Sequence, residues 1–487
     1  MTVKNLEPTA LWSHFADLNA VPRPSKKEER VIQFMMDFGN SLGLETVKDA
    51  IGNVVIKKKA SPGMEDRKTV ILQSHLDMVH QKNSDTVFDF DSQGIEMIVD
   101  GDWVRANGTT LGADNGIGVA AIMAILSSTD IQHPAIEAMF TIDEETGMTG
   151  AMELDPSNFD GEILLNLDTE DDDELSIGCA GGIDSNTSLE YEQVDLWQDA
   201  AIFELKVSGL VGGHSGMDID KGRGNANKLM NRMLEKLMTI KGFQLISIDG
   251  GSLRNAIPRE SVAQFAINHD FEGMLDVEFS TMSLTLKTEF ESIEKELKFT
   301  LNPVVSSASK AVSPSDLLKI VRSIYSVHNG VYRMSPDIEG LVETSSSLAR
   351  VIVKDGEFTT QSLQRSSVES TKQDVANSVR ASFESVGCQV VQNGDYPGWQ
   401  PNKDSEILNL MHELYVEKFS EEPQVKACHA GLECGILLQH LPKVDMISFG
   451  PNIRAPHSPD EKVQISSVQK FWGYLLEALV RIPKKSA

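Results

Sequence analysis

The feature that most constrains the fold is a series of short apolar runs that each end abruptly in polar residues. Three of these runs are "TVILQSHLD" (69–77), "AMFTIDEETG" (138–147) and "EILLNLDTED" (162–171). Their lengths are typical of strands, and helix-like runs separate them, which is the pattern of a three-layer α/β domain. We therefore predict an α/β fold whose main sheet is mixed and mostly parallel. Side chains alternate along a strand, so His75 and Asp77 would point to the same side.

The pattern of strand-like and helix-like segments changes near residue 185. From 186 to 395, strand-like stretches alternate with polar amphipathic helices, as in an α+β domain. From 396 the α/β pattern of the first 185 residues returns. A length of 487 residues also favours two domains. We predict a discontinuous first domain over 1–185 and 396–487, with a second domain inserted over 186–395. The sequence shows no internal repeat.

Composition narrows the expected partners and location. With 72 acidic and 44 basic residues, the net charge is −28, which argues against non-specific nucleic-acid binding and against a polybasic membrane contact. No apolar run approaches the roughly 20 residues that span a bilayer, and the first 20 residues lack the apolar region of a signal peptide. The four cysteines form neither a CxxC pair nor a disulfide framework. We expect a cytoplasmic protein.

Polar residues collect at one predicted edge of the sheet. "TTLGADN" places Asp114 at the start of a buried helix over 115–128, and the strand "VDMISFG" is followed by a loop that holds His457. Ligands of open α/β sheets bind beyond the carboxyl ends of the strands, where all five segments would deliver their polar residues. Each segment alone has a simpler interpretation. Asp114 would be a helix N-cap, and the acidic stretches would be solvated turns.

Taken together, these residues favour a metal centre. A catalytic zinc usually takes three protein ligands, so two ions need six contacts, which five side chains supply if one carboxylate bridges. Paired ions are a recurrent hydrolytic device, and histidine with carboxylates suits zinc, with cobalt or manganese as substitutes. The residues alone leave open which carboxylate would bridge.

Other catalytic motifs are weaker. "GIGVAA" (116–121) fits a dinucleotide-binding pattern, but no apolar strand precedes it. "GGHSGMD" fails the serine elbow because Met217 stands where glycine is required, and there is no HExxH. A cysteine nucleophile has no histidine at a recognisable spacing.

The five segments resemble the co-catalytic zinc metallopeptidase family. That family includes aminoacylases, succinyl-diaminopimelate desuccinylase, glutamate carboxypeptidase and carnosinases. Its pattern is H-x-D, G-x-D-(N/D)-G, E-E, D and a late H, and this chain has in order "SHLDMV", "GADNG", "DEETG", "NLDTE" and "APHSPDE". The resemblance covers essentially the whole chain. Within the family, "HLDMVHQK" and "CHAGLECGIL" are most similar to the dipeptidases that act on Xaa-His peptides.

Carried over by position, the resemblance implies a two-zinc site. Asp114 would bridge the two ions. His75 and Asp168 would complete one site, and Glu145 and His457 would complete the other.

The resemblance also implies two catalytic roles beside the metals. Asp77 would orient His75, as histidine ligands generally require. Glu144 would be the general base, taking a proton from the attacking water and passing it to the leaving amine.

The inserted domain resembles the lid and dimerisation domain of the family. His214 in "GLVGGHSG" would hydrogen-bond the oxyanion of the transition state, often in the other subunit of a homodimer. Asn255 in "RNAIP" and Arg365 in "LQRSS" would bind the substrate. The guanidinium of Arg365 would bind the free carboxylate of the substrate. Glu433 departs from the Gly-Gly-Thr-Asp type of segment found in deacylases, and it would meet the amino group of a peptide.

The resemblance thus implies a zinc-dependent dipeptidase that cleaves Xaa-His and related unblocked dipeptides. One alternative is an N-acyl-amino-acid deacylase or carboxypeptidase of the same architecture. A second, of a different class, is a catalytically dead metal-binding scaffold, against which Glu144 argues.

Overall fold

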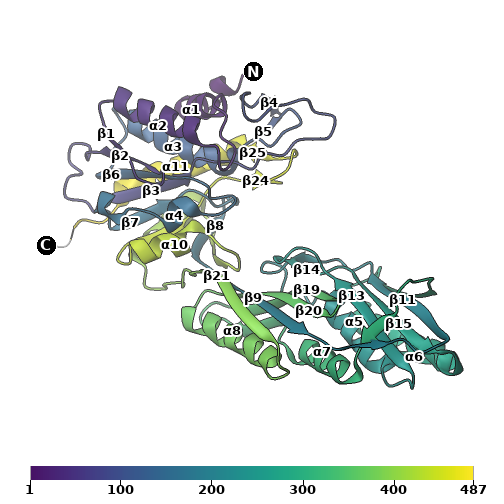
Figure 1. Ribbon diagram of the computed structural model, residues 1–487. Helices are drawn as coiled ribbons and strands as arrows, with labels where there is room; N and C mark the ends of the chain where they lie inside the picture. Colours follow the sequence, from purple (N-terminus) through teal and green to yellow (C-terminus); the bar gives the residue numbers. More distant parts are fainter. Residues whose placement is uncertain (1, 486–487) are drawn as a thin grey trace. The chain divides into compact units, whose positions relative to one another are not determined.

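The computed structural model describes residues 2–485, which divide into two units (Figure 1). The first unit comprises the described residues up to Gly178, Trp399–Ala427 and the described residues from Leu432 onward. The second comprises Cys179–Gly398 and the short segment Cys428–Gly431. Each unit has its own sheet and core. Among the described residues, no helix has both the length and the hydrophobicity needed to span a membrane.

The first unit is built on a mixed sheet with strand order β1-β2-β6-β3-β7-β23-β8-β22. Its strands are β1 (Glu45–Lys48), β2 (Val54–Lys58), β3 (Val70–His75), β6 (Ile136–Thr141), β7 (Ile163–Asn166), β8 (Glu174–Cys179), β22 (Gln424–Cys428) and β23 (Asp445–Ser448). The central strands β6, β3, β7 and β23 are parallel, whereas β2 and β8 run antiparallel to their neighbours. The predicted mixed sheet is confirmed, and its parallel centre brings four carboxyl ends to one edge.

Helices lie on both sides of this sheet. In Figure 1, α1, α2 and α3 lie on one side and α4 and α10 on the other, which is the predicted three-layer arrangement. The helices of this unit are α1 (Thr9–Asn19), α2 (Glu29–Ser41), α3 (Ala113–Ser127), α4 (Thr149–Met152), α9 (Glu406–Phe419), α10 (Glu433–His440) and α11 (Ile465–Arg481). Because α3 is apolar all round, it is buried along nearly its whole length.

A second, smaller sheet completes the first unit. Its strands pair in the order β24-β25-β5-β4, with bounds β4 (Met97–Asp100), β5 (Trp103–Ala106), β24 (Ile453–Arg454) and β25 (Lys462–Gln464). Strands β24 and β25 pair antiparallel, so they anchor both ends of the loop between them. That loop holds His457.

The second unit is built on one long antiparallel sheet with strand order β16-β11-β15-β13-β19-β20-β9-β21, and β18 adds to β19. Its strands are β9 (Gly181–Glu190), β11 (Ala200–Ser208), β13 (Phe243–Gly250), β15 (Ser261–Asn268), β16 (Lys298–Pro303), β18 (Gly330–Met334), β19 (Val342–Lys354), β20 (Glu357–Ser366) and β21 (Gln389–Tyr396). Two short pairs lie beside it: β10 (Gln193–Asp195) with β17 (Lys310–Val312), and β12 (Gly213–His214) with β14 (Ala256–Ile257).

The long sheet contains the same topology twice. The helices of this unit are α5 (Ala226–Leu237), α6 (Glu272–Phe290), α7 (Pro314–Ser326) and α8 (Glu369–Glu384). One half reads β11-α5-β13-β15-α6-β16, and the other reads β9-α7-β19-β20-α8-β21. Both are βαββαβ units whose strands lie in the spatial order fourth, first, third, second. The two second strands, β13 and β19, pair antiparallel and join the halves.

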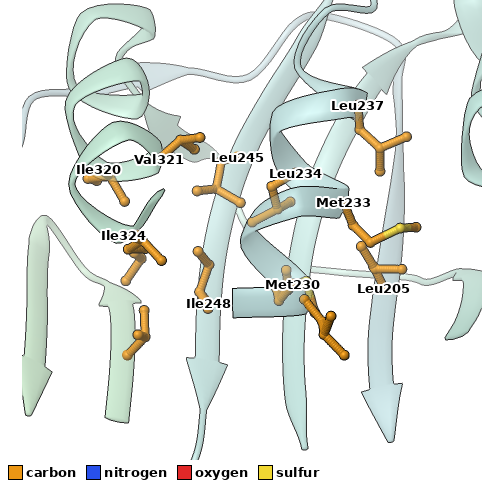
Figure 2. Packing of buried hydrophobic residues seen from close by; sticks show 14 of the residues in the cluster. Leu205, Met230, Met233, Leu234, Leu237, Leu245, Ile248, Ile320, Val321 and Ile324 are labelled. Atoms are coloured by element: carbon orange, nitrogen blue, oxygen red, sulfur yellow. The ribbon is translucent and has the colours of Figure 1, made fainter. Parts of the chain in front are cut away.

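The repeat is hidden in the sequence because one half is inserted into the other. The first half lies in the chain between β9 and α7, so no contiguous segment repeats. Helices α5 and α7 pack on the joined sheet and share one core, as Figure 2 shows. Met230, Met233, Leu234 and Leu237 of α5 form an apolar stripe at helical spacing.

Candidate metal centre

Five residues from separate segments come together at the carboxyl edge of the first unit's sheet. His75 ends β3, Glu145 and Asp168 follow β6 and β7, Asp114 lies in the first turn of α3, and His457 lies between β24 and β25. They form two groups whose ligand atoms all lie within 4.8 Å of one another: His75 with Asp114 and Asp168, and Asp114 with Glu145 and His457. Asp114 belongs to both groups.

The distances show how Asp114 serves both groups. Its Oδ1 lies 3.2 Å from His75 Nε2, and its Oδ2 lies 3.2 Å from His457 Nε2. His75 Nε2 is also 3.6 Å from Asp168 Oδ1, and His457 Nε2 is 2.9 Å from Glu145 Oε2. Each oxygen of one carboxylate therefore faces a different histidine, which is the arrangement a bridging ligand needs.

The charges at this edge also fit a pair of divalent cations. Burial raises the pKa of Asp168 well above its usual range, and the charges of Asp114 and Glu433 raise it further. Hydrogen bonds to Asp114 and Glu145 raise the pKa of His457 to about 11. Glu145 Oε1 is buried and has no hydrogen-bond partner among residues 2–485. One buried carboxylate oxygen is left without a partner within that range, and histidine with carboxylates is a donor set that suits zinc.

The structure contradicts the simple interpretation of Asp114 as a helix N-cap. Asp114 lies at a kink near the start of α3, with a non-helical φ of −81° and ψ of 110°, and its carboxylate oxygens bond to His75 and His457. Instead, Glu461 Oε1 and Oε2 accept hydrogen bonds from the backbone N–H groups at this end of the helix. The Asp114 carboxylate is therefore left facing the histidines.

Asp77 lies beneath the site and contacts three of its components. Its Oδ1 lies 3.4 Å from His75 Nδ1 and accepts a hydrogen bond of 3.0 Å from the Glu144 N–H, while Oδ2 accepts one of 3.3 Å from the Glu145 N–H. Its side chain is fully buried. A proton held on His75 Nδ1 leaves the lone pair of Nε2 directed toward Asp114 and Asp168.

Glu144 belongs to the same cluster, because its ligand atom and those of His75 and Glu145 lie within 4.8 Å of one another. Its Oε2 is 4.0 Å from His75 Nε2. Burial raises the pKa of the Glu144 carboxyl well above its ordinary value, and the charges of Asp168, Glu433 and Glu145 raise it further. A carboxyl with a raised pKa is a better proton acceptor, which suits a general base.

Glu433 begins α10 and lies beside the ends of β3 and β6. Its Oε2 accepts hydrogen bonds from Gln73 Nε2 at 2.7 Å and from Thr141 Oγ1 at 2.8 Å. Its Oε1 is buried without a partner in the described part of the chain, and burial raises its pKa to about 7. This oxygen is available to a cation or an N–H donor.

The three candidates in the inserted unit also lie close together. His214 in β12 pairs with Ala256 of β14, and the carbonyl of Asn255 accepts a 2.8 Å hydrogen bond from the Ser215 N–H. His214 Nδ1 accepts hydrogen bonds from the N–H groups of Gly216 and Met217, at 3.1 and 3.0 Å. Because Nδ1 is an acceptor, the ring proton is assigned to Nε2. Burial and the charge of Arg365 lower the pKa of His214, which keeps the ring neutral.

Arg365 is a buried cation with an unused hydrogen-bond donor. Its side chain lies in β20, it is 4% exposed, and Nη1 donates a 2.9 Å hydrogen bond to Tyr396 Oη. Its Nε has no hydrogen-bond partner within residues 2–485. His429, which sequence reasoning missed, accepts or donates a 2.7 Å hydrogen bond with Ser345, the residue paired with Arg365 across the sheet.

Sequence reasoning also missed the buried polar residues that support the ligands. Arg23, Gln73 and Glu461 are 1%, 0% and 2% exposed. Most of their partners lie far away in the chain, so no local spacing marks their roles. Only Glu461 could have been suspected from the sequence, because it stands four residues after the predicted ligand His457.

Comparison with known proteins identifies the family. Residues 71–481 match the model of the peptidase family M20/M25/M40. The chain belongs to this peptidase family, and the resemblance seen in its motifs is confirmed.

Two relatives match over nearly their whole length. The chain is 40% identical over 483 residues to the cytosol non-specific dipeptidase of Escherichia coli, covering 99% of each protein. It is 41% identical in sequence to aminoacylhistidine dipeptidase from Vibrio alginolyticus. The crystal structure of that protein matches with a TM-score of 0.93, covering 100% of this chain and 99% of that one. An aminopeptidase from Bacillus cereus shares the fold alone, with a TM-score of 0.56 and 14% identity over 97% of this chain and 98% of that one.

Proposed function

We propose that this protein is a cytoplasmic, zinc-dependent dipeptidase that hydrolyses Xaa-His and related unblocked dipeptides. The observation that carries the proposal is the sharing of Asp114 between two ligand groups, with the carboxyl of Glu144 beside them. The two relatives that match the whole chain are named as dipeptidases, one of them for aminoacylhistidine substrates.

The five clustered residues would hold two zinc ions per subunit. His75 and Asp168 would bind one ion, Glu145 and His457 the other, and Asp114 both. When bound, such a pair lowers the pKa of a water molecule and polarises the carbonyl of the scissile bond. Cobalt and manganese accept the same donors and would substitute for zinc.

The chain's own residues would move the proton and hold the reacting groups. Glu144 takes a proton from the attacking water and gives it to the leaving amine, so it is a base first and an acid afterwards. Asp77 keeps His75 in one tautomer and fixes the backbone of Glu144. His214 donates a hydrogen bond from Nε2 to the oxygen that becomes negative in the transition state.

Substrate selection would come from the two ends of the dipeptide. The unpaired oxygen of Glu433 receives the free amino group, because a buried carboxylate needs a positive partner. Arg365, with Asn255 beside His214, receives the free carboxylate through charge-assisted hydrogen bonds.

A substrate panel tests this function. Purified protein would be assayed with Xaa-His dipeptides, carnosine, tripeptides and N-acetyl amino acids, before and after chelation. We expect unblocked dipeptides to be cleaved fastest, with activity lost on chelation and restored by zinc, cobalt or manganese. Faster turnover of N-acetyl amino acids would identify a deacylase, and no turnover of any substrate would identify a dead scaffold.

The role of Glu433 has its own test. Glu433→Gln removes the charge and keeps the size, so kcat/KM should fall for unblocked dipeptides and change little for N-acetylated ones. Equal losses on both substrate types would contradict recognition of the amino group.

We also propose that the chain forms a homodimer through the inserted unit. Support comes from α6, where Met274, Val277 and Leu284 are 49%, 63% and 69% exposed at helical spacing. Light scattering should give twice the chain mass, and Leu284→Glu should reduce it, whereas Val87→Glu in the first unit should not. A wild-type monomer at micromolar concentration would contradict the proposal.

A further inference from the structure

One carboxylate holds the backbone of the loop that carries Asp114. Glu461 Oε2 accepts hydrogen bonds from the N–H groups of Leu111 and Gly112 at 2.7 and 2.9 Å. Its Oε1 accepts from those of Ala113 and Asp114 at 2.7 and 3.3 Å. The first turn of a helix has N–H groups without partners inside the helix, and a carboxylate satisfies them well. Glu461 therefore satisfies the N–H groups of residues 111–114, and none of these bonds uses the Asp114 side chain.

A buried guanidinium holds the same loop by its carbonyl. Arg23 Nη2 donates to the Gly112 carbonyl at 2.6 Å, and Nη1 donates to the carbonyls of Leu76 and Asp77 at 2.9 and 3.0 Å. Arg23 is 1% exposed, so these bonds replace its hydration.

The packing of Arg23 explains both glycines of "GADNG". A Cβ on Gly112 would lie 2.5 Å from Arg23 Nη2, and one on Gly116 would lie 2.6 Å from the same atom. Gly112 also has a φ of +68°, which disfavours other residues. The two glycines of the motif are therefore explained by their contact with Arg23, a residue far from them in the chain.

Each of these two groups joins segments that carry different ligands. Arg23 ties the residues after His75 to the loop before Asp114. Glu461 ties that loop to the segment four residues beyond His457. Three ligands on three separate elements are thereby held by two buried side chains that bond to the backbone.

We propose that Arg23 and Glu461 are positioning residues that set the spacing of His75, Asp114 and His457 and so determine the metal affinity of the centre. The proposal rests on the metal-binding role given to these ligands above. The competing interpretation is that the two residues only stabilise the fold, in which case they would affect unfolding but not metal binding.

Glu461→Gln is the decisive variant. An amide has one acceptor oxygen, so its NH₂ group would face two backbone N–H groups and displace the loop. The matched control is Glu137→Gln. Glu137 is a buried carboxylate in the same unit that accepts hydrogen bonds from the N–H groups of Asp160 and Gly161, both at 3.0 Å. It lies near the start of β6, at the opposite end of that strand from the ligands.

Three measurements separate positioning from stability. They are zinc affinity by chelator competition, the absorption spectrum of the cobalt form, and the melting temperature of the metal-free protein. Loss of a residue that orients metal ligands typically costs about 10–100-fold in affinity. We expect a loss of that size and an altered cobalt spectrum for Glu461→Gln, and neither change for Glu137→Gln.

Wild-type affinity and an unchanged cobalt spectrum in Glu461→Gln would overturn the proposal. If that variant does not fold, Arg23→Lys gives the answer, because an ammonium cannot span the acceptors of a guanidinium fork. Weakened metal binding with an altered spectrum would support the proposal, and wild-type binding would overturn it. A wild-type protein that binds no metal would instead refute the proposed function.

Discussion

Replacing Asp77 with asparagine tests whether one buried carboxylate organises the metal centre. Three of the groups that face it are His75 Nδ1 and the N–H groups of Glu144 and Glu145, all donors, and the Ser25 hydroxyl also bonds to it. An amide offers one acceptor oxygen and places an NH₂ group against the remaining donors. The change keeps the shape of the side chain, so it removes charge and one acceptor without leaving a cavity.

The size of the effect follows from these contacts. A hydrogen bond to a charged group contributes about 1.5–3 kcal/mol, and at least one of the three bonds is lost. Since each ~1.4 kcal/mol is a factor of ten, the loss corresponds to roughly 10–150-fold. Burial would raise the pKa of Asp77, but hydrogen bonds and the charge of His75 lower it, so the carboxylate is charged at neutral pH.

The assay is kcat/KM on an Xaa-His dipeptide at saturating zinc, together with zinc affinity. Asp316→Asn is the matched control, because this buried carboxylate accepts a 2.8 Å hydrogen bond from the Glu192 N–H in the other unit. We expect Asp77→Asn to lose about 10–100-fold in one or both quantities. Values within twofold of wild type in both would refute the role assigned to Asp77.

Three further variants test separate parts of the account. Glu144→Gln should bind wild-type amounts of metal and lose about 10²–10⁴-fold in kcat, and near-normal kcat would reject it as the base. Gly112→Ala should lower the free energy of unfolding by at least about 1–2 kcal/mol, measured in urea, because its backbone is left-handed. In the metal-free protein, Glu433→Gln should raise stability at pH 8 but not at pH 4. Burial raises the pKa of Glu433 from 4.5 to about 7, so ionisation costs stability progressively as the pH rises from the lower value to the higher one. An equal change at both pH values would contradict this.

The sequence predicts those features that depend on local periodicity. Apolar runs of strand length predict the sheet, and parallel neighbours necessarily end at one edge, which is why polar residues after β3, β6 and β7 meet. The all-round apolar sequence of α3 predicts its burial. These inferences need only the geometry of single elements and a short-range packing rule.

The remaining features depend on contacts between distant residues. Asp114 looked like an N-cap because nothing nearby shows that Glu461, about 350 residues later, accepts those N–H groups. Arg23 carries no sequence signal, because most of its acceptors are backbone carbonyls that no sequence pattern marks. The doubled topology of the second unit was invisible because β9 is separated from the rest of its half by the inserted half.

The most direct test of the central claim is a titration of the metal-free protein with zinc, following both bound metal and hydrolysis of an Xaa-His dipeptide. Two ligand groups that share Asp114 predict binding of two ions per chain, and full activity only as the second site fills. Glu144→Gln should give the same binding curve with almost no turnover. Full activity in the metal-free protein, or saturation at a single ion, would contradict the two-metal account.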